Sequence, residues 1–193
     1  MIRKIVLMTH VAASVGWMGA AAVFLALGVV GMANEDQTVV RGVYQVMEPA
    51  AWLALLPFAL ASLVSGIVMS LVTTWGLFQH YWVVFKLLIN AFATVVLLTY
   101  MATFNQMAAA AGDATLRLDA VRSPSPVLHS ILALLLLIVA MALGVYKPPA
   151  VTRGSVTPGW VKVFGAIGIV VVVLYVALHL AGGGHARHVA SSL

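Results

Sequence analysis

The chain has 193 residues, of which 63% are hydrophobic and only 8% are charged, and its mean hydropathy is +1.10. Soluble domains carry roughly 25% charged residues, so this composition excludes a soluble or disordered protein and predicts one that is embedded in a lipid bilayer. The net charge of +5 rests on ten scattered Lys and Arg residues, which are too few for a nucleic-acid-binding surface. The absence of cysteine excludes disulfides, thiolate metal sites and iron–sulfur clusters.

Five apolar stretches are long enough to cross a membrane, because a spanning helix needs about 20 mostly apolar residues. In chain order they cover residues 5–32, 49–75, 81–107, 127–146 and 160–181. The first stretch is longer than the apolar part of a signal peptide, so we expect it to be retained. The sequence therefore predicts an all-α bundle of five transmembrane helices that forms a single domain over residues 1–193.

The basic residues favour one orientation of this bundle, since Lys and Arg are enriched in cytoplasmic loops. The side of the N-terminus carries five basic residues and no acid: Arg3, Lys4, Lys147, Arg153 and Lys162. The opposite side carries four Arg residues and all five acids of the chain. We therefore expect a cytoplasmic N-terminus and an external C-terminus in the plasma membrane.

The loop after the first stretch has a helical pattern of its own. Val39, Val43, Val46 and Met47 recur at helical spacing, which fits a short interfacial helix. A plain connecting loop fits the same residues. The longest loop, over residues 108–126, is expected to be an amphipathic or irregular surface segment.

Ionisable side chains within the predicted helices are the first place to look for function, because they are costly in a bilayer and usually face a cavity or the bundle interior. They are His10, Lys86, His129 and His179, with His80 at a helix edge, and none is an acid. The lack of carboxylates argues against a proton relay and against sites for hard cations. Histidine suits haem iron, copper or zinc.

His129 and His179 are the first candidate pair. At about 1.5 Å per residue, His129 lies roughly 26 Å from Tyr146, and His179 lies roughly 28 Å from Trp160. Tyr146 and Trp160 are the predicted cytoplasmic ends of consecutive antiparallel helices, so the two histidines have similar depth near the external face. Two facing imidazoles can hold a low-spin haem b, and Tyr175 and Gly168 share the His179 face. The alternative is that each histidine is hydrogen-bonded to a neighbouring helix and that the glycine belongs to a packing seam.

His10 and Lys86 are the second candidate pair. Each lies about five residues into its helix, on the side expected to be cytoplasmic. Trp17 shares the face of His10, and Asn90 shares the face of Lys86. These two faces would line a polar pocket that binds a cofactor through His10. The alternative for Lys86 is a side chain that snorkels to the membrane surface.

Two short motifs carry a family resemblance. His10, followed after six residues by Trp17 and then by Gly19, resembles the first helix of CopD-like proteins and of HemJ-type protoporphyrinogen oxidases, and Trp82 with Lys86 resembles their third helix. The resemblance covers about the first three helices. It implies bound haem and functional roles for His10 and Lys86. The fifth helix and the second histidine pair are not part of that pattern, so the resemblance implies haem rather than one reaction.

The sequence thus predicts an integral membrane protein with one or two b-type haems. His10, His129 and His179 are the expected metal ligands, and Lys86 with His10 the expected catalytic groups. The function would be electron transfer across the bilayer or haem-dependent oxidoreductase chemistry, with a redox protein or a quinone as partner. A transporter or export component for copper, haem or a small solute is the alternative, as is a non-catalytic assembly partner.

Copper is less favoured than haem, because the nine methionines are scattered. Small-residue faces at Ala12, Gly16 and Ala20 leave a homo-oligomer open.

Overall fold

The computed structural model describes residues 1–73, 75–149, 151–152, 157 and 159–182, with side chains up to residue 176. Its described residues confirm the all-α prediction and contain five helical stretches that are long and apolar enough to cross a membrane. The structure divides into two units, Met1–Pro149 and Ala150–Leu193. Four of the apolar stretches belong to the first unit, and the fifth is helix α7 (Gly159–Gly182) of the second.

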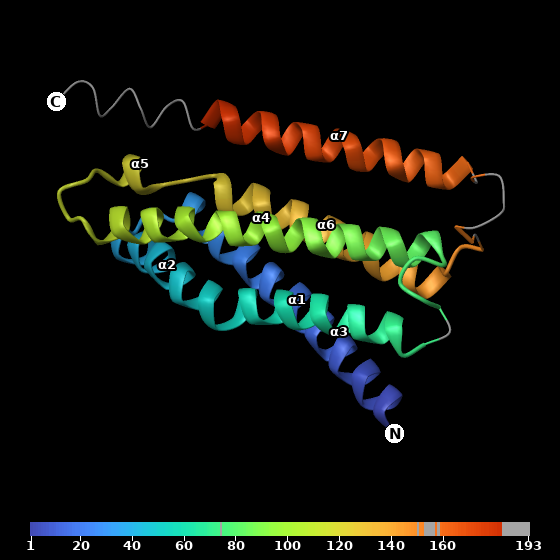
Figure 1. Cartoon of the computed structure of the whole chain (residues 1–193). Helices are drawn as coiled ribbons and strands as arrows, with labels where there is room; N and C mark the ends of the chain where they lie inside the picture. Colours follow the sequence, from blue (N-terminus) through green and yellow to red (C-terminus); the bar gives the residue numbers. More distant parts are fainter. Residues whose placement is uncertain (74, 150, 153–156, 158, 183–193) are drawn as a thin grey trace. The chain divides into compact units, whose positions relative to one another are not determined.

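Four helices pack together in the first unit (Figure 1): α1 (Ile2–Ala33), α3 (Leu56–Leu71), α4 (Tyr81–Gly112) and α6 (Ser125–Tyr146). Helix α1 packs against α3 and α6, and α4 packs against the same two helices. Helices α1 and α3 approach closely because α1 has Gly16 at the crossing, where an added Cβ would lie only 2.8 Å from the ring of Phe58.

The second apolar stretch belongs to a longer helix than the sequence predicts. Helix α2 (Gln37–Ala50) continues through a π-helical turn, η1 (Ala51–Leu55), into α3. The Asp36 side chain accepts a hydrogen bond from the Thr38 N–H at 2.8 Å and so caps the start of α2. Pro49 lies inside α2 and lacks an N–H, and the π turn follows directly.

Residues 39–47, which the sequence leaves open between an interfacial helix and a loop, are thus helical. The helix packs on the bundle, mainly against α4 and α1. Its apolar face is fully buried at Val40, Tyr44 and Met47. The observed helix ends at Leu71, before the predicted end at residue 75.

The two ends of the first unit differ in charge. The acidic end comprises the end of α1, helix α2, the end of α4 and the short helix α5 (Leu118–Val121), and it carries all five acids of the chain: Glu35, Asp36, Glu48, Asp113 and Asp119. Arg41 of α2 stabilises this end by donating hydrogen bonds to one carbonyl in the last turn of α4 and to two carbonyls in the loop that follows. The other end, here called the basic end, joins the start of α1, the end of α3, the start of α4 and the end of α6 (Figure 1).

Candidate functional site

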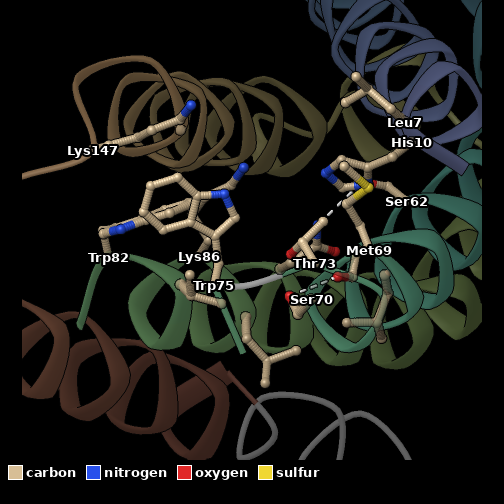
Figure 2. A pocket seen from close by; sticks show the side chains of 16 residues that line it. Leu7, His10, Ser62, Met69, Ser70, Thr73, Trp75, Trp82, Lys86 and Lys147 are labelled. Carbon is tan, nitrogen blue, oxygen red and sulfur yellow. Dashed lines mark hydrogen bonds between the residues drawn. The ribbon is translucent and has the colours of Figure 1, made fainter. Parts of the chain in front are cut away.

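A cavity of about 240 Å³ lies at the basic end, between α1, α3, α4 and α6 (Figure 2). Most of its wall is apolar. The side chains that bring chemistry to it are His10, Ser62, Trp75, Lys86, Asn90 and Lys147. His10 and Lys86 thus line the same space, although its wall is mostly apolar and not the polar pocket that the sequence predicts. Their roles as cofactor ligand and catalytic group stay predictions.

A hydrogen bond from the next helix orients His10. Its Nδ1 lies 3.1 Å from the Oγ of Ser65, and that hydroxyl donates its own proton to the Ala61 carbonyl. The Ser65 oxygen therefore accepts from Nδ1–H, and the neutral imidazole keeps its lone pair on Nε2. The ring also lies against the backbone of α3, since an added Cβ on Gly66 would be 3.1 Å from Cε1 of His10. This is the tautomer that a metal-ligating or proton-accepting histidine needs.

Asn90 links three helices through a chain of side-chain hydrogen bonds. Its Nδ2 donates to Ser62 Oγ at 3.1 Å, and Ser62 Oγ lies 2.9 Å from Ser14 Oγ. The Asn90 Oδ1 atom is buried and has no hydrogen-bond donor among the described residues. Because buried polar atoms are almost always paired, this atom calls for a water molecule or a ligand.

Two lysines from different helices reach the cavity beside Trp75 (Figure 2). Lys86 of α4 lies against the last turn of α6, where an added Cβ on Gly144 would be 2.8 Å from its Nζ. Lys147 ends α6 in the left-handed conformation, with φ of 42°. Its Nζ lies 5.4 Å from the ring centroid of Trp75. Lys86 is thus half-buried beside a second cation.

His80 belongs to an aromatic cluster next to the cavity. Its Nδ1–H donates to the Trp75 carbonyl at 2.9 Å, and its ring packs edge-on against the Trp75 ring at 5.2 Å. Trp82 packs against Trp75 in the same way, at 5.4 Å between centroids. His80 itself is not among the cavity-lining residues. It precedes the first turn of α4, which agrees with its predicted place at a helix edge.

His129 lines a different and smaller cavity of about 60 Å³ between α1, η1, α4 and α6. Its ring stacks on Tyr100 with centroids 4.2 Å apart, and its Nδ1–H donates to the Ser125 carbonyl at 2.9 Å. Trp17, which the sequence groups with His10, is buried in the wall of this smaller cavity. The contacts described for His129 are thus all made within the first unit.

The predicted partners of His129 belong to the second unit. Tyr175 is a half-buried residue of α7, and the side chain of His179 lies outside the described residues. The pairing of His129 with His179 therefore stays a prediction.

The sequence alone does not identify Ser62, Ser65 and Lys147 as residues of the site. A signal for the two serines was present, because Ser62, Ser65 and Ser70 recur at helical spacing in an otherwise apolar stretch. For Lys147 the sequence indicates only a basic residue in a loop. Its place in the cavity follows from the left-handed turn at the end of α6, which the sequence does not reveal.

Comparisons of the chain with protein-family models, with curated proteins and with solved structures give no match. The resemblance of the two short motifs to the CopD-like and HemJ-type groups therefore stays a prediction.

Proposed function

We propose that this chain is a multi-pass plasma-membrane protein that binds haem b in the cavity at the basic end and acts in redox chemistry. The observation that carries the proposal is the state of His10, whose Nδ1 is held by Ser65 and whose Nε2 keeps a lone pair. A histidine that lines a mostly apolar cavity in this tautomer is suited to ligate iron.

The donor set fits haem better than a metal ion without a macrocycle. Among the described residues, no three His, Asp or Glu side chains gather at one point. Haem iron needs only one or two axial ligands from the protein, since the macrocycle supplies the others. The rings of Trp75 and Trp82 give the cavity flat apolar walls against which a macrocycle could pack.

The chain's own residues would then divide the work. His10 would be the axial ligand, and Ser65 would fix its ring and tautomer. Lys86, which lines the same cavity, would present a positive charge beside the cofactor. When bound, haem would supply one-electron chemistry, and the protein would set its potential through ligand choice, burial and hydrogen bonding.

The absorption spectrum of the purified full-length protein tests this proposal. We expect a Soret band and reduced α and β bands of b type, which His10→Ala removes. Thr9→Ala is the matched control, because Thr9 is the exposed neighbour of His10 on the same helix. His129→Ala distinguishes the two candidate sites. If only this variant loses the spectrum, the haem is bound in the smaller cavity and not at His10. A colourless wild-type protein would reject haem and favour a transport or assembly role.

A further inference from the structure

The basic end holds two ammonium groups that no acid of this chain balances. Lys86 and Lys147 line the same cavity. All five Asp and Glu residues of the sequence are described, and all lie at the acidic end of the first unit. Among the described residues, neither lysine forms an ion pair or donates a hydrogen bond.

The groups around the lysines offset only part of this charge. The Lys86 ammonium lies near the last turn of α6, where the helix dipole contributes about half a negative unit charge. The Trp75 ring offers Lys147 a cation–π contact at 5.4 Å. Two full positive charges therefore exceed the compensation that the protein itself provides. Lys86 is half-buried and Lys147 is exposed at the edge of the cavity. A half-buried ammonium without an acidic partner favours a counter-ion, and the second charge beside it strengthens that demand.

We infer that the space between Lys86 and Lys147 binds the oxyanion head group, a carboxylate or a phosphate, of an amphipathic molecule. The mostly apolar wall of the cavity, which includes Trp75, Trp82 and Leu87, would receive the apolar part of that molecule. Basic pockets between transmembrane helices are known to bind anionic head groups. The inference does not require haem at His10. Where haem is bound, it would use the same wall, and its own carboxylates would occupy the space between the two lysines.

Native mass spectrometry of the full chain in a non-ionic detergent, read on the species that carries no haem, tests the inference. The probes are dodecyl phosphate and dodecanoate, and dodecanol is the uncharged control with the same tail. We expect one anionic probe to bind per chain, at least about ten-fold more tightly than dodecanol, because charge-assisted hydrogen bonds are lost with the charge. Equal retention of dodecanol and dodecyl phosphate would overturn the inference.

Matched variants locate the site. Lys86→Met and Lys147→Met should each weaken probe binding by about ten-fold or more, whereas Lys4→Met, which removes an exposed charge outside the cavity, should not. Lys147→Arg should retain binding, which shows that the fold tolerates the position. Gly144→Ala keeps both charges but displaces the Lys86 ammonium and should weaken binding. Unchanged binding in folded Lys→Met variants contradicts the assignment.

Two further arms identify the source of the oxyanion. If inorganic phosphate at the same concentration does not displace dodecyl phosphate, an amphipathic ligand is supported. If inorganic phosphate does displace it, the apolar part of the ligand contributes nothing and an amphipathic ligand is ruled out. The same titration is repeated on haem-free His10→Ala protein. Binding there supports a site that is independent of haem, and its loss contradicts that independence.

Discussion

Ser65 of α3 holds His10 of α1 in a defined state, because its Oγ accepts from Nδ1–H at 3.1 Å while its own proton is engaged by the Ala61 carbonyl. This arrangement fixes both the orientation of the ring and the nitrogen that carries the lone pair. The hydrogen bond also links α1 to α3 at His10, the candidate cofactor ligand.

Replacing Ser65 with alanine should therefore weaken haem binding without removing it. Loss of a group that orients a metal-ligating histidine typically lowers metal affinity by about 10- to 100-fold. The rate of haem transfer to excess apomyoglobin measures the change. Thr99→Ala is the matched control, because the Thr99 hydroxyl donates to the Val96 carbonyl of its own helix and does not line the cavity. Equal transfer rates in the two variants would show that Ser65 does not support a ligand.

Asn90→Leu should separate stability from ligand binding. The change removes one hydrogen bond to Ser62, worth about 1 kcal/mol, but it also removes a buried acceptor without a donor, which costs about 1–3 kcal/mol. We expect the free energy of unfolding, measured by titration with a denaturing detergent, to stay the same or to rise by up to about 2 kcal/mol. Haem retention should nevertheless fall. A large loss of stability with full haem retention would instead assign Asn90 a structural role.

Arg41 should be a major stabiliser of the acidic end. Its guanidinium donates to the carbonyls of Ala111, Asp113 and Leu116, and Arg41→Leu should lower the free energy of unfolding by about 1–3 kcal/mol. Arg41→Lys should not restore it, because one ammonium cannot reproduce the fork of donors. Hydrogen exchange in residues 113–121 should rise in both variants.

The control for Arg41 is another arginine at the same end. Arg117 pairs with Asp119 at 3.5 Å, but their side chains are 88% and 77% exposed. Exposed ion pairs contribute roughly 0–1 kcal/mol. Arg117→Leu should therefore leave hydrogen exchange nearly unchanged, and an effect equal to that of Arg41→Leu would contradict the account.

The loop after α4 should loosen only in acid. Hydrogen bonds from the Thr115 hydroxyl and N–H lower the pKa of Asp113 below its ordinary value of 3.8. A lowered pKa contributes stability that is present above the unfolded value and is lost as the pH falls through the folded value. The protection factors of the loop amides, which are exchange rates corrected for their intrinsic pH dependence, should thus be constant from about pH 5 to 7 and fall below about pH 4. Asp113→Asn should remove this pH dependence.

The spanning helices could be predicted because apolar length is a local property of the sequence. The start of the second helix could not, since residues 37–48 include Arg41, Gln45 and Glu48 and do not resemble a membrane span. These residues are helical because Val40, Tyr44 and Met47 pack into the bundle. That packing is a tertiary effect, which no local pattern fixes.

The candidate site could be predicted in part. Counting residues along each helix placed His10 beside the cavity of Lys86 and Asn90, because helical rise is regular. Trp17 shares the His10 face but lies seven residues further on, roughly 10 Å along the helix. It therefore lines the smaller cavity with His129. A shared face gives direction, whereas only the packing of neighbouring helices decides which cavity a side chain enters.

Chemical rescue of His10→Gly tests the central claim most directly. If His10 is an axial haem ligand, the glycine variant should lose the b-type spectrum, and added imidazole should restore it by entering the space that the ring leaves. Binding of imidazole in place of the side chain cannot be explained by a purely structural histidine. A His10→Gly protein that keeps the wild-type spectrum without imidazole would contradict the account.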